Sequence, residues 1–217
     1  MEIKPFIFCT RLHLTELTGL KASGLEQLLA QLKQVPDSCI YHHTHRFLQQ
    51  HQYLSPEPPN DFAYWVSDIL GDDELGEELA SIDTIQFSSL GSLRDKIIST
   101  IEKHIEKEPP SKNRFARFGE EFHFMKSISF LIPTGQVVND LKEFTEILKK
   151  MSLDSIYFHI FESRLRLGRK ANDFSAWIES SFGEKELARK ISALDPYTYT
   201  LDELRNKVVR LIEGRSK

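Results

Sequence analysis

One pattern in this chain occurs twice, and that repetition constrains the fold more than any other feature. The first occurrence is CIYHH (residues 39–43) with NDFAYW (60–65), and the second is SIYFH (155–159) with NDFSAW (172–177). Upstream of the pattern, Phe6 matches Phe122 at the same offset as Tyr41 matches Tyr157. A repeat this long is far beyond the period of solenoid proteins, so the sequence predicts duplication of a small helical domain.

The apolar spacing predicts a mainly α fold built of two pseudo-symmetric helical copies. Leu25, Leu28 and Leu32 lie on one face of a predicted helix, and residues 90–105 show a similar period. Residues 1–106 are the predicted first copy, residues 107–120 a polar linker that contains prolines, and residues 121–217 the second copy, with both copies packed as one globular unit.

Two segments with apolar residues at every second position interrupt the helical pattern. Residues 6–14 and 122–130 both show this alternation, which is typical of short strands. Because unpaired strand edges need partners, we expect these two segments to pair with each other as antiparallel strands.

Composition narrows the class of protein and of partner. The chain has 217 residues, 40% of them hydrophobic, and a net charge of −4, which gives no long-range attraction to nucleic acid or anionic lipid. Its two cysteines are too few for a disulfide framework, which favours the cytoplasm. No window approaches the roughly 18 consecutive apolar residues of a membrane span, and we expect no signal peptide. The expected partner is an unknown small molecule or a protein.

Two histidines, His43 and His159, occur at equivalent positions in the repeated pattern. Each shares a helical face with an isoleucine and should point inward, with Asp61 and Asp173 as the nearest repeated acids. A His–Asp pair suits a general base, but a core histidine with satisfied hydrogen bonds has the same partners. The sequence leaves both roles open and identifies no catalytic residue.

A duplicated fold often binds its ligand where two half-sites meet, which predicts a pocket between the copies. The candidate lining residues are Tyr41, His43, Asp61, Trp65, Tyr157, His159, Asp173 and Trp177. Arg164 and Arg166 add a positive region that suits an anion, although cations near a helix C-terminus are also favoured by the helix dipole.

His42 and His45 are weak candidates for a metal site. They lie one helical turn apart, but the sequence places no third ligand near them, and the repeat has Phe158 and Phe161 at their positions. The alternative is that they are surface or half-buried histidines without a metal. We therefore predict neither a bound metal nor a cofactor.

Four strings of residues resemble a prokaryotic family that is catalogued only as a domain of unknown function. They are YHHTHRFL (41–48), YLSPEPPNDF (53–62), IYFH (156–159) and NDF (172–174). The resemblance covers most of the chain and implies a stand-alone soluble bacterial or archaeal protein without an assigned reaction. It supplies no catalytic residues.

The sequence therefore predicts a cytoplasmic helical binding or interaction module with a pocket between its two copies. The alternative is an enzyme that uses the histidine-rich first copy for acid–base or metal-dependent chemistry. None of the motifs GxSxG, HExxH, GxGxxG or the Walker loop is present, so the common enzyme classes have no support. The sequence does not predict an oligomeric state.

Overall fold

The computed structural model describes residues 4–46, 60–163, 165, 171–194 and 199–214. The chain divides into two compact units. The central unit is His13–Ile128, and the terminal unit combines Met1–Leu12 with Ser129–Lys217.

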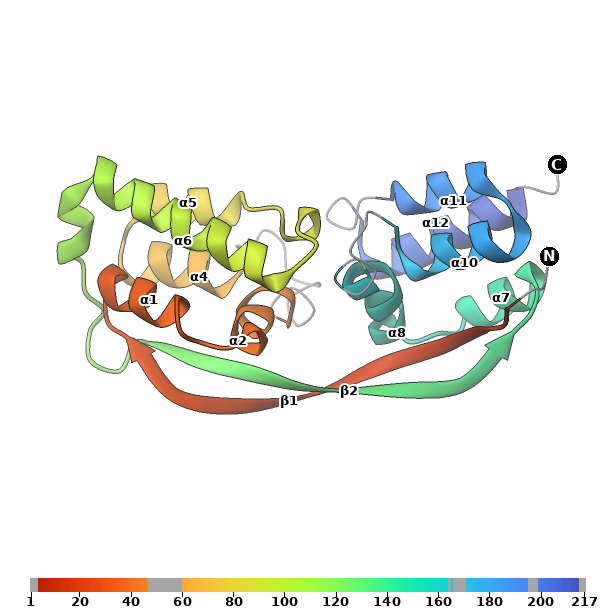
Figure 1. Ribbon diagram of the computed structural model, residues 1–217, viewed down its shortest axis with the longest axis horizontal. Coiled ribbons are helices and arrows are strands. Elements are labelled where there is room, and N and C mark those ends of the chain that lie inside the picture. The colour runs from red at the N-terminus through yellow and green to blue at the C-terminus, as the bar shows by residue number, and fades with distance from the viewer. Residues whose placement is uncertain (1–3, 47–59, 164, 166–170, 195–198, 215–217) are drawn as a thin grey trace. The chain divides into compact units, whose positions relative to one another are not determined.

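The central unit contains the α-helices labelled α1 to α6 in Figure 1, together with short π- and 3-10-helical segments. They are α1 (Leu25–Leu32), α2 (Asp37–Tyr41), η1 (His42–Arg46), α4 (Asp61–Tyr64), η2 (Trp65–Ile69), α5 (Asp73–Ala80), η3 (Thr84–Gln86), α6 (Leu90–Lys107) and η4 (Pro109–Asn113). The predicted helices at 25–32 and 90–105 are thereby confirmed. Asn60 caps α4 by accepting a hydrogen bond from the Ala63 N–H.

The terminal unit has its own set of helices. They are α7 (Leu141–Leu148), α8 (Leu153–Tyr157), η5 (Phe158–Glu162), α10 (Asp173–Phe182), α11 (Lys185–Ser192) and α12 (Leu201–Glu213). Asn172 caps α10 and forms a capping box with Ser175, which satisfies backbone groups at the helix start. Gly183 ends this helix with φ +70°, a conformation that suits glycine.

Two long strands, β1 (Phe6–Ala22) and β2 (Phe122–Val138), form a two-stranded antiparallel sheet (Figure 1). The described chain is 60% helix and 19% strand. The prediction of a mainly α fold is therefore wrong, and the protein is a mixed α/β protein. Residues 15–21 escaped the strand prediction because most of their side chains are exposed and leave no apolar alternation to detect.

The two alternating segments lie in strands that pair antiparallel, as predicted, but the predicted bounds, residues 6–14 with residues 122–130, are wrong because the strands are longer and pair in another register. The Thr18 hydroxyl donates to the Phe124 carbonyl at 2.6 Å, and the Thr134 hydroxyl donates to the Phe8 carbonyl at 2.9 Å. Phe8 therefore lies near Thr134, in the second half of β2. Antiparallel strands of 17 residues each put the start of one strand beside the end of the other.

Each hydrophobic core depends on aromatic residues from these strands. Phe122 and Phe124 of β2 are buried in the core of the central unit, where the Phe122 ring stacks on Phe62 with centroids 5.1 Å apart. Phe6 and Phe8 of β1 are buried in the core of the terminal unit. Helices and strands therefore share each core.

The division into residues 1–106, 107–120 and 121–217 stays a prediction. The proposed linker region contains η4 and an isolated antiparallel bridge between Phe115 and Gly24. In the described ranges, no helix has the length and apolar character needed to cross a membrane.

We expect Phe122→Ala to lower the free energy of unfolding by about 3–5 kcal/mol, because it removes a buried ring and leaves a cavity in the central core. Phe118 is 99% exposed, so Phe118→Ala should change stability by less than about 0.5 kcal/mol. Urea denaturation of both variants measures the difference. Equal midpoints for the two variants would contradict the role of β2 in this core.

Candidate functional site

His43 of η1 is buried and uses both ring nitrogens. Its Nδ1 lies 2.6 Å from Asp61 Oδ2, and its Nε2 lies 2.9 Å from the Met125 backbone nitrogen. Because a backbone N–H can only donate, Nε2 must be the unprotonated acceptor, and Nδ1–H donates to the carboxylate. His43 thereby connects the helices of the central unit to β2.

His159 of η5 has the same arrangement in the terminal unit. Its Nδ1 lies 2.7 Å from Asp173 Oδ2, and its Nε2 accepts a hydrogen bond from the Cys9 N–H at 2.9 Å. Both predicted His–Asp pairs are confirmed, and both imidazoles are only 3% exposed. With both ring nitrogens bonded to protein groups, the geometry favours a structural role. A ligand contact by either histidine stays a prediction.

In the repeated Asn-Asp pair, the asparagine caps a helix and also bonds to a neighbouring helix. Asn60 caps α4 and also donates from Nδ2 to the Leu79 carbonyl at 3.0 Å, while Asn172 donates to the Ile191 carbonyl at 3.3 Å. Each asparagine therefore links one helix start to a neighbouring helix. The adjacent aspartate in each pair holds the histidine.

The aromatic candidates lie within the cores of the two units. Trp65 donates from Nε1 to the Glu120 carbonyl at 2.8 Å, and Trp177 donates to the Lys4 carbonyl at 2.7 Å. Tyr41 places its hydroxyl 3.1 Å from His13 Nε2, and Tyr157 stacks on Phe161 with centroids 4.7 Å apart. All four candidate side chains are buried. Arg164 and Arg166 lie outside the described residues.

His42 and His45 occupy different surroundings on η1. His42 Nδ1 lies 2.9 Å from Ser127 Oγ, whereas the buried His45 ring stacks on Tyr41 and its Nδ1 lies 3.0 Å from Thr44 Oγ1. Within the described part of the chain, neither histidine belongs to a group of three side chains that could hold a metal.

The half-buried His42 is a neutral imidazole over most of the pH range. Burial, followed by repulsion from neighbouring His43, lowers the pKa of His42 to about 4. The ordinary histidine pKa is about 6.5, so the unfolded chain binds more protons between these two values. Stability that depends on neutral His42 is therefore complete above about pH 6.5 and is lost as the pH falls toward 4.

We expect His42→Phe to reduce the acid sensitivity of the fold. Phe158 already occupies the matching position in the terminal unit and is buried, so an aromatic ring suits this environment. Between about pH 6.5 and 4.5, the wild type should lose on the order of 1 kcal/mol more stability than the variant, after allowance for partial solvent screening of His42. Denaturation at a series of pH values measures this, with exposed His123→Phe as the control that keeps the wild-type slope.

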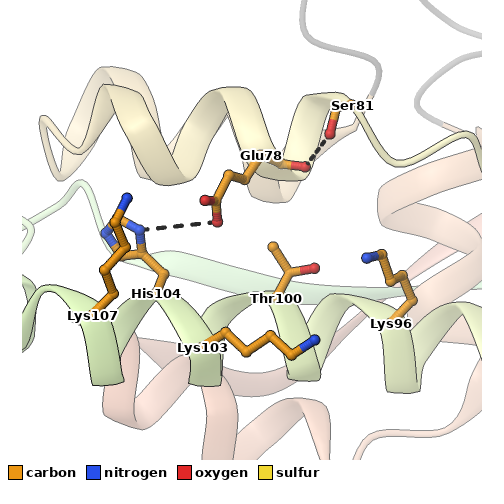
Figure 2. A pocket seen from close by; sticks show the side chains of 7 residues that line it. All are labelled: Glu78, Ser81, Lys96, Thr100, Lys103, His104 and Lys107. Carbon is orange, nitrogen blue, oxygen red and sulfur yellow. Dashed lines mark hydrogen bonds and ion pairs between the residues drawn. The ribbon is translucent and has the colours of Figure 1, made fainter.

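A cavity of about 280 Å³ lies between α5 and α6 of the central unit (Figure 2). Its lining residues are Glu78, Ser81, Lys96, Thr100, Lys103, His104 and Lys107. Figure 2 shows Glu78 of α5 facing His104 of α6, with the three lysines projecting from α6. Lysines and one carboxylate thus line the same space.

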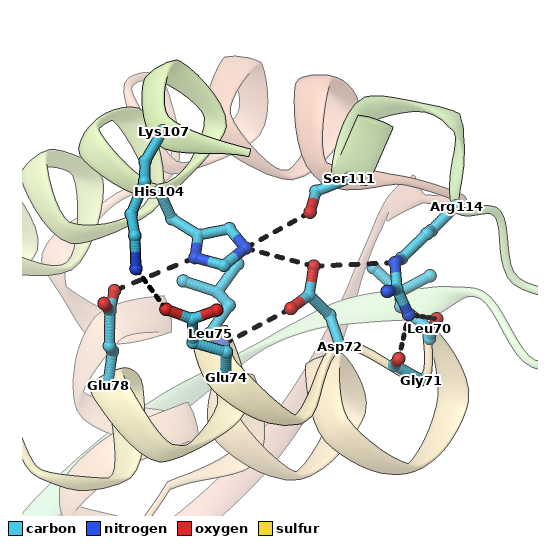
Figure 3. Close-up of polar contacts among 10 residues, drawn as sticks. All are labelled: Leu70, Gly71, Asp72, Glu74, Leu75, Glu78, His104, Lys107, Ser111 and Arg114. Atoms are coloured by element: carbon cyan, nitrogen blue, oxygen red, sulfur yellow. Dashed lines mark hydrogen bonds and ion pairs between the residues drawn. The ribbon is translucent and has the colours of Figure 1, made fainter. Parts of the chain in front are cut away.

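His104 is the most buried of the residues that line this cavity, and its side chain is 1% exposed. Its Nε2 lies 3.2 Å from both Asp72 Oδ2 and Ser111 Oγ (Figure 3). Burial acts to raise the pKa of Asp72, but hydrogen bonds from Ser111 and the Leu75 N–H, together with the nearby His104, outweigh it and lower that pKa. Asp72 is therefore an ionised acceptor at neutral pH.

The charges at the cavity are only partly paired. Lys107 forms an ion pair with Glu74, as Figure 3 shows, while Lys96 and Lys103 form no ion pair among the described residues. Two exposed cations are therefore left to face solvent or a ligand.

The sequence did not reveal this cavity. Most of the predicted site residues belong to the repeated pattern, whereas α11 has Lys190 one turn after Glu186, where α5 has Glu78 one turn after Glu74. The available signal was the pair of glutamates on α5 together with a histidine in the last turn of α6. Nothing local in the sequence states which faces of these two helices meet.

Comparisons with known proteins extend the resemblance seen in the sequence. Residues 3–213 match the family of unknown function DUF5752. A solved structure, described as the structure of OrfY from Thermoproteus tenax, is similar to this chain with a TM-score of 0.81 and 30% sequence identity. The match covers 97% of this chain and 95% of that one. No curated protein matches significantly.

Proposed function

Because the chain belongs to DUF5752, whose function is unknown, we propose from its own residues that it is a binding module that holds a small anionic molecule in the α5–α6 cavity. The observation that carries this proposal is the group of three lysines that line the cavity, Lys96, Lys103 and Lys107. The proposed ligand is a small molecule with a phosphate or carboxylate group.

Electrostatics support an anion over a neutral or cationic ligand. Against the three lysines, Glu78 is the only carboxylate among the lining residues, although the chain as a whole carries a net charge of −4. A local excess of positive charge in a concave site raises the concentration of anions there. The ammonium groups of Lys96 and Lys103 can donate hydrogen bonds to phosphate or carboxylate oxygens.

The cavity has a suitable scaffold and further polar groups. Its residues belong to α5 and α6 or directly follow α5, and helices position side chains more firmly than loops do. Thr100 is buried at the cavity, and its hydroxyl can donate to a ligand oxygen. A volume of about 280 Å³ suits a small metabolite better than a peptide.

The alternative of an acid–base enzyme has weaker support. His43 and His159 each bond one ring nitrogen to an aspartate and the other to a backbone N–H, so neither ring nitrogen is available for proton transfer in this arrangement. A binding role needs no such group, and we assign no catalytic residue.

We place this function in the cytoplasm of a prokaryotic cell. Cys9 and Cys39 form no disulfide bond within the described part of the chain, which suits a reducing compartment. The similarity to a protein from Thermoproteus tenax supports the prokaryotic part of the proposal.

We expect the double substitution of Lys96→Ala and Lys103→Ala to weaken binding of inorganic pyrophosphate or citrate about tenfold, because it removes two unpaired cations. Isothermal titration at low salt measures the affinity, which should also fall as the salt concentration rises. Lys185→Ala, an exposed lysine of α11 outside the cavity, is the control and should bind like the wild type. Equal loss in both variants, or no anion binding by the wild type, would refute the proposal.

A further inference from the structure

The two ring nitrogens of His104 have different surroundings. Nε2 faces an aspartate oxygen and a serine hydroxyl, both at 3.2 Å, whereas the buried Nδ1 has no hydrogen-bond partner among the residues that the structure describes. A carboxylate only accepts hydrogen bonds, so in the neutral imidazole Nε2 carries the proton that is donated to Asp72. The lone pair of His104 is therefore on Nδ1.

That lone pair points toward two carboxylates. Nδ1 lies 4.0 Å from Glu78 Oε2, and one ligand atom each from Glu74, Glu78 and His104 lie within 4.8 Å of one another. Figure 3 shows both glutamates on the Nδ1 side of the ring and Asp72 on the Nε2 side. The Lys107 ammonium pairs with Glu74 here, but the lone pair of the buried His104 Nδ1 stays without a donor among the described residues, and a cation bound between the imidazole and the two carboxylates would satisfy it.

We infer that Glu74, Glu78 and His104 form a binding site for a divalent transition-metal ion, with Zn²⁺ as the best-matched ion. A carboxylate that accepts from the second nitrogen of a metal-binding histidine fixes the tautomer and orients the ring, and Asp72 is placed to do this. The inference does not depend on the proposed anion site.

The ligand spacing is compatible with a metal after a small adjustment. Zinc bonds of about 2.0–2.2 Å in a tetrahedron put neighbouring ligand atoms about 3.4 Å apart, so the observed group must contract by roughly 1 Å. The side chains of Glu74 and Glu78 are 53% and 42% exposed and can move by that amount, while the buried imidazole stays fixed. Because Glu74 and Glu78 are one turn apart on α5, both can reach the same point.

The chemistry of the donor set selects among metals. An imidazole nitrogen with two carboxylates suits zinc and its neighbours in the first transition row, whereas Mg²⁺ and Ca²⁺ prefer all-oxygen sites. Glu78 and His104 also line the α5–α6 cavity, so a bound metal would border that space.

Lys107 supplies a specific test, because its ammonium pairs with Glu74 and would have to leave when a metal binds. Its side chain is 61% exposed, so it can swing into solvent. A lysine that competes with the metal for one ligand lowers metal affinity. Lys107→Met should therefore strengthen metal binding, which a purely structural role of this cluster would not produce.

We expect the full chain, titrated with ZnCl₂ in metal-free chloride buffer without phosphate, to bind one Zn²⁺ at this site. Glu78→Gln should weaken Zn²⁺ binding at least tenfold, and Lys107→Met should strengthen it about threefold or more. MgCl₂ and CaCl₂ should bind at least about a hundredfold more weakly than ZnCl₂. Isothermal titration calorimetry measures the affinities, and a shift of the His104 Nδ1 resonance in nitrogen NMR locates the metal.

Glu77→Gln is the matched control, because Glu77 is an exposed glutamate on the same helix outside this group and should leave the affinity unchanged. Both glutamines replace solvent-exposed side chains, and unchanged circular dichroism verifies folding. The inference is overturned if the wild type binds no Zn²⁺, or if Glu78→Gln binds Zn²⁺ as tightly as Glu77→Gln does, which would place the metal elsewhere. A wild type that binds Zn²⁺ but no anion would refute the proposed function alone.

Discussion

The backbone N–H groups of a strand that enters a helical core must find acceptors, and in this protein two imidazoles supply them. His43 accepts from Met125 of β2, and His159 accepts from Cys9 of β1, each with an aspartate on the opposite ring nitrogen. The aspartate fixes the tautomer that leaves Nε2 as an acceptor. Both histidines lie in π-helical turns, a rare backbone conformation that tends to persist where a side chain has a specific task.

Aromatic packing surrounds each of these imidazoles. The ring centroids of Phe122 and His43 are 4.7 Å apart, and those of Phe6 and His159 are 5.0 Å apart. β1 also ends with Ala22 in the core of the central unit, and β2 ends with Val138 in the core of the terminal unit. Each strand therefore contributes to both cores, which explains why the strands are long in a protein whose mass is mostly helical.

The polar groups that a ligand could contact lie away from the two His–Asp pairs. Buried groups with all their hydrogen bonds satisfied stabilise a fold. In the α5–α6 cavity, by contrast, Lys96 and Lys103 have no ion pair and the buried His104 Nδ1 has no hydrogen-bond partner among the described residues. Unsatisfied buried polar atoms are uncommon in native proteins. This contrast is the reason why we propose a structural role for the His–Asp pairs and a binding role for the cavity.

The sequence by itself determined the features that depend on neighbours along the chain. Helical spacing located α1 and α6, and inward-facing histidines with repeated aspartates nearby predicted both His–Asp pairs. Only the tertiary structure decided the length and register of the strands, because hydrogen bonds between distant segments leave no apolar pattern where the side chains are exposed. It alone also brought Glu78 to His104, since that meeting depends on how α5 and α6 are rotated against each other, which no local spacing encodes.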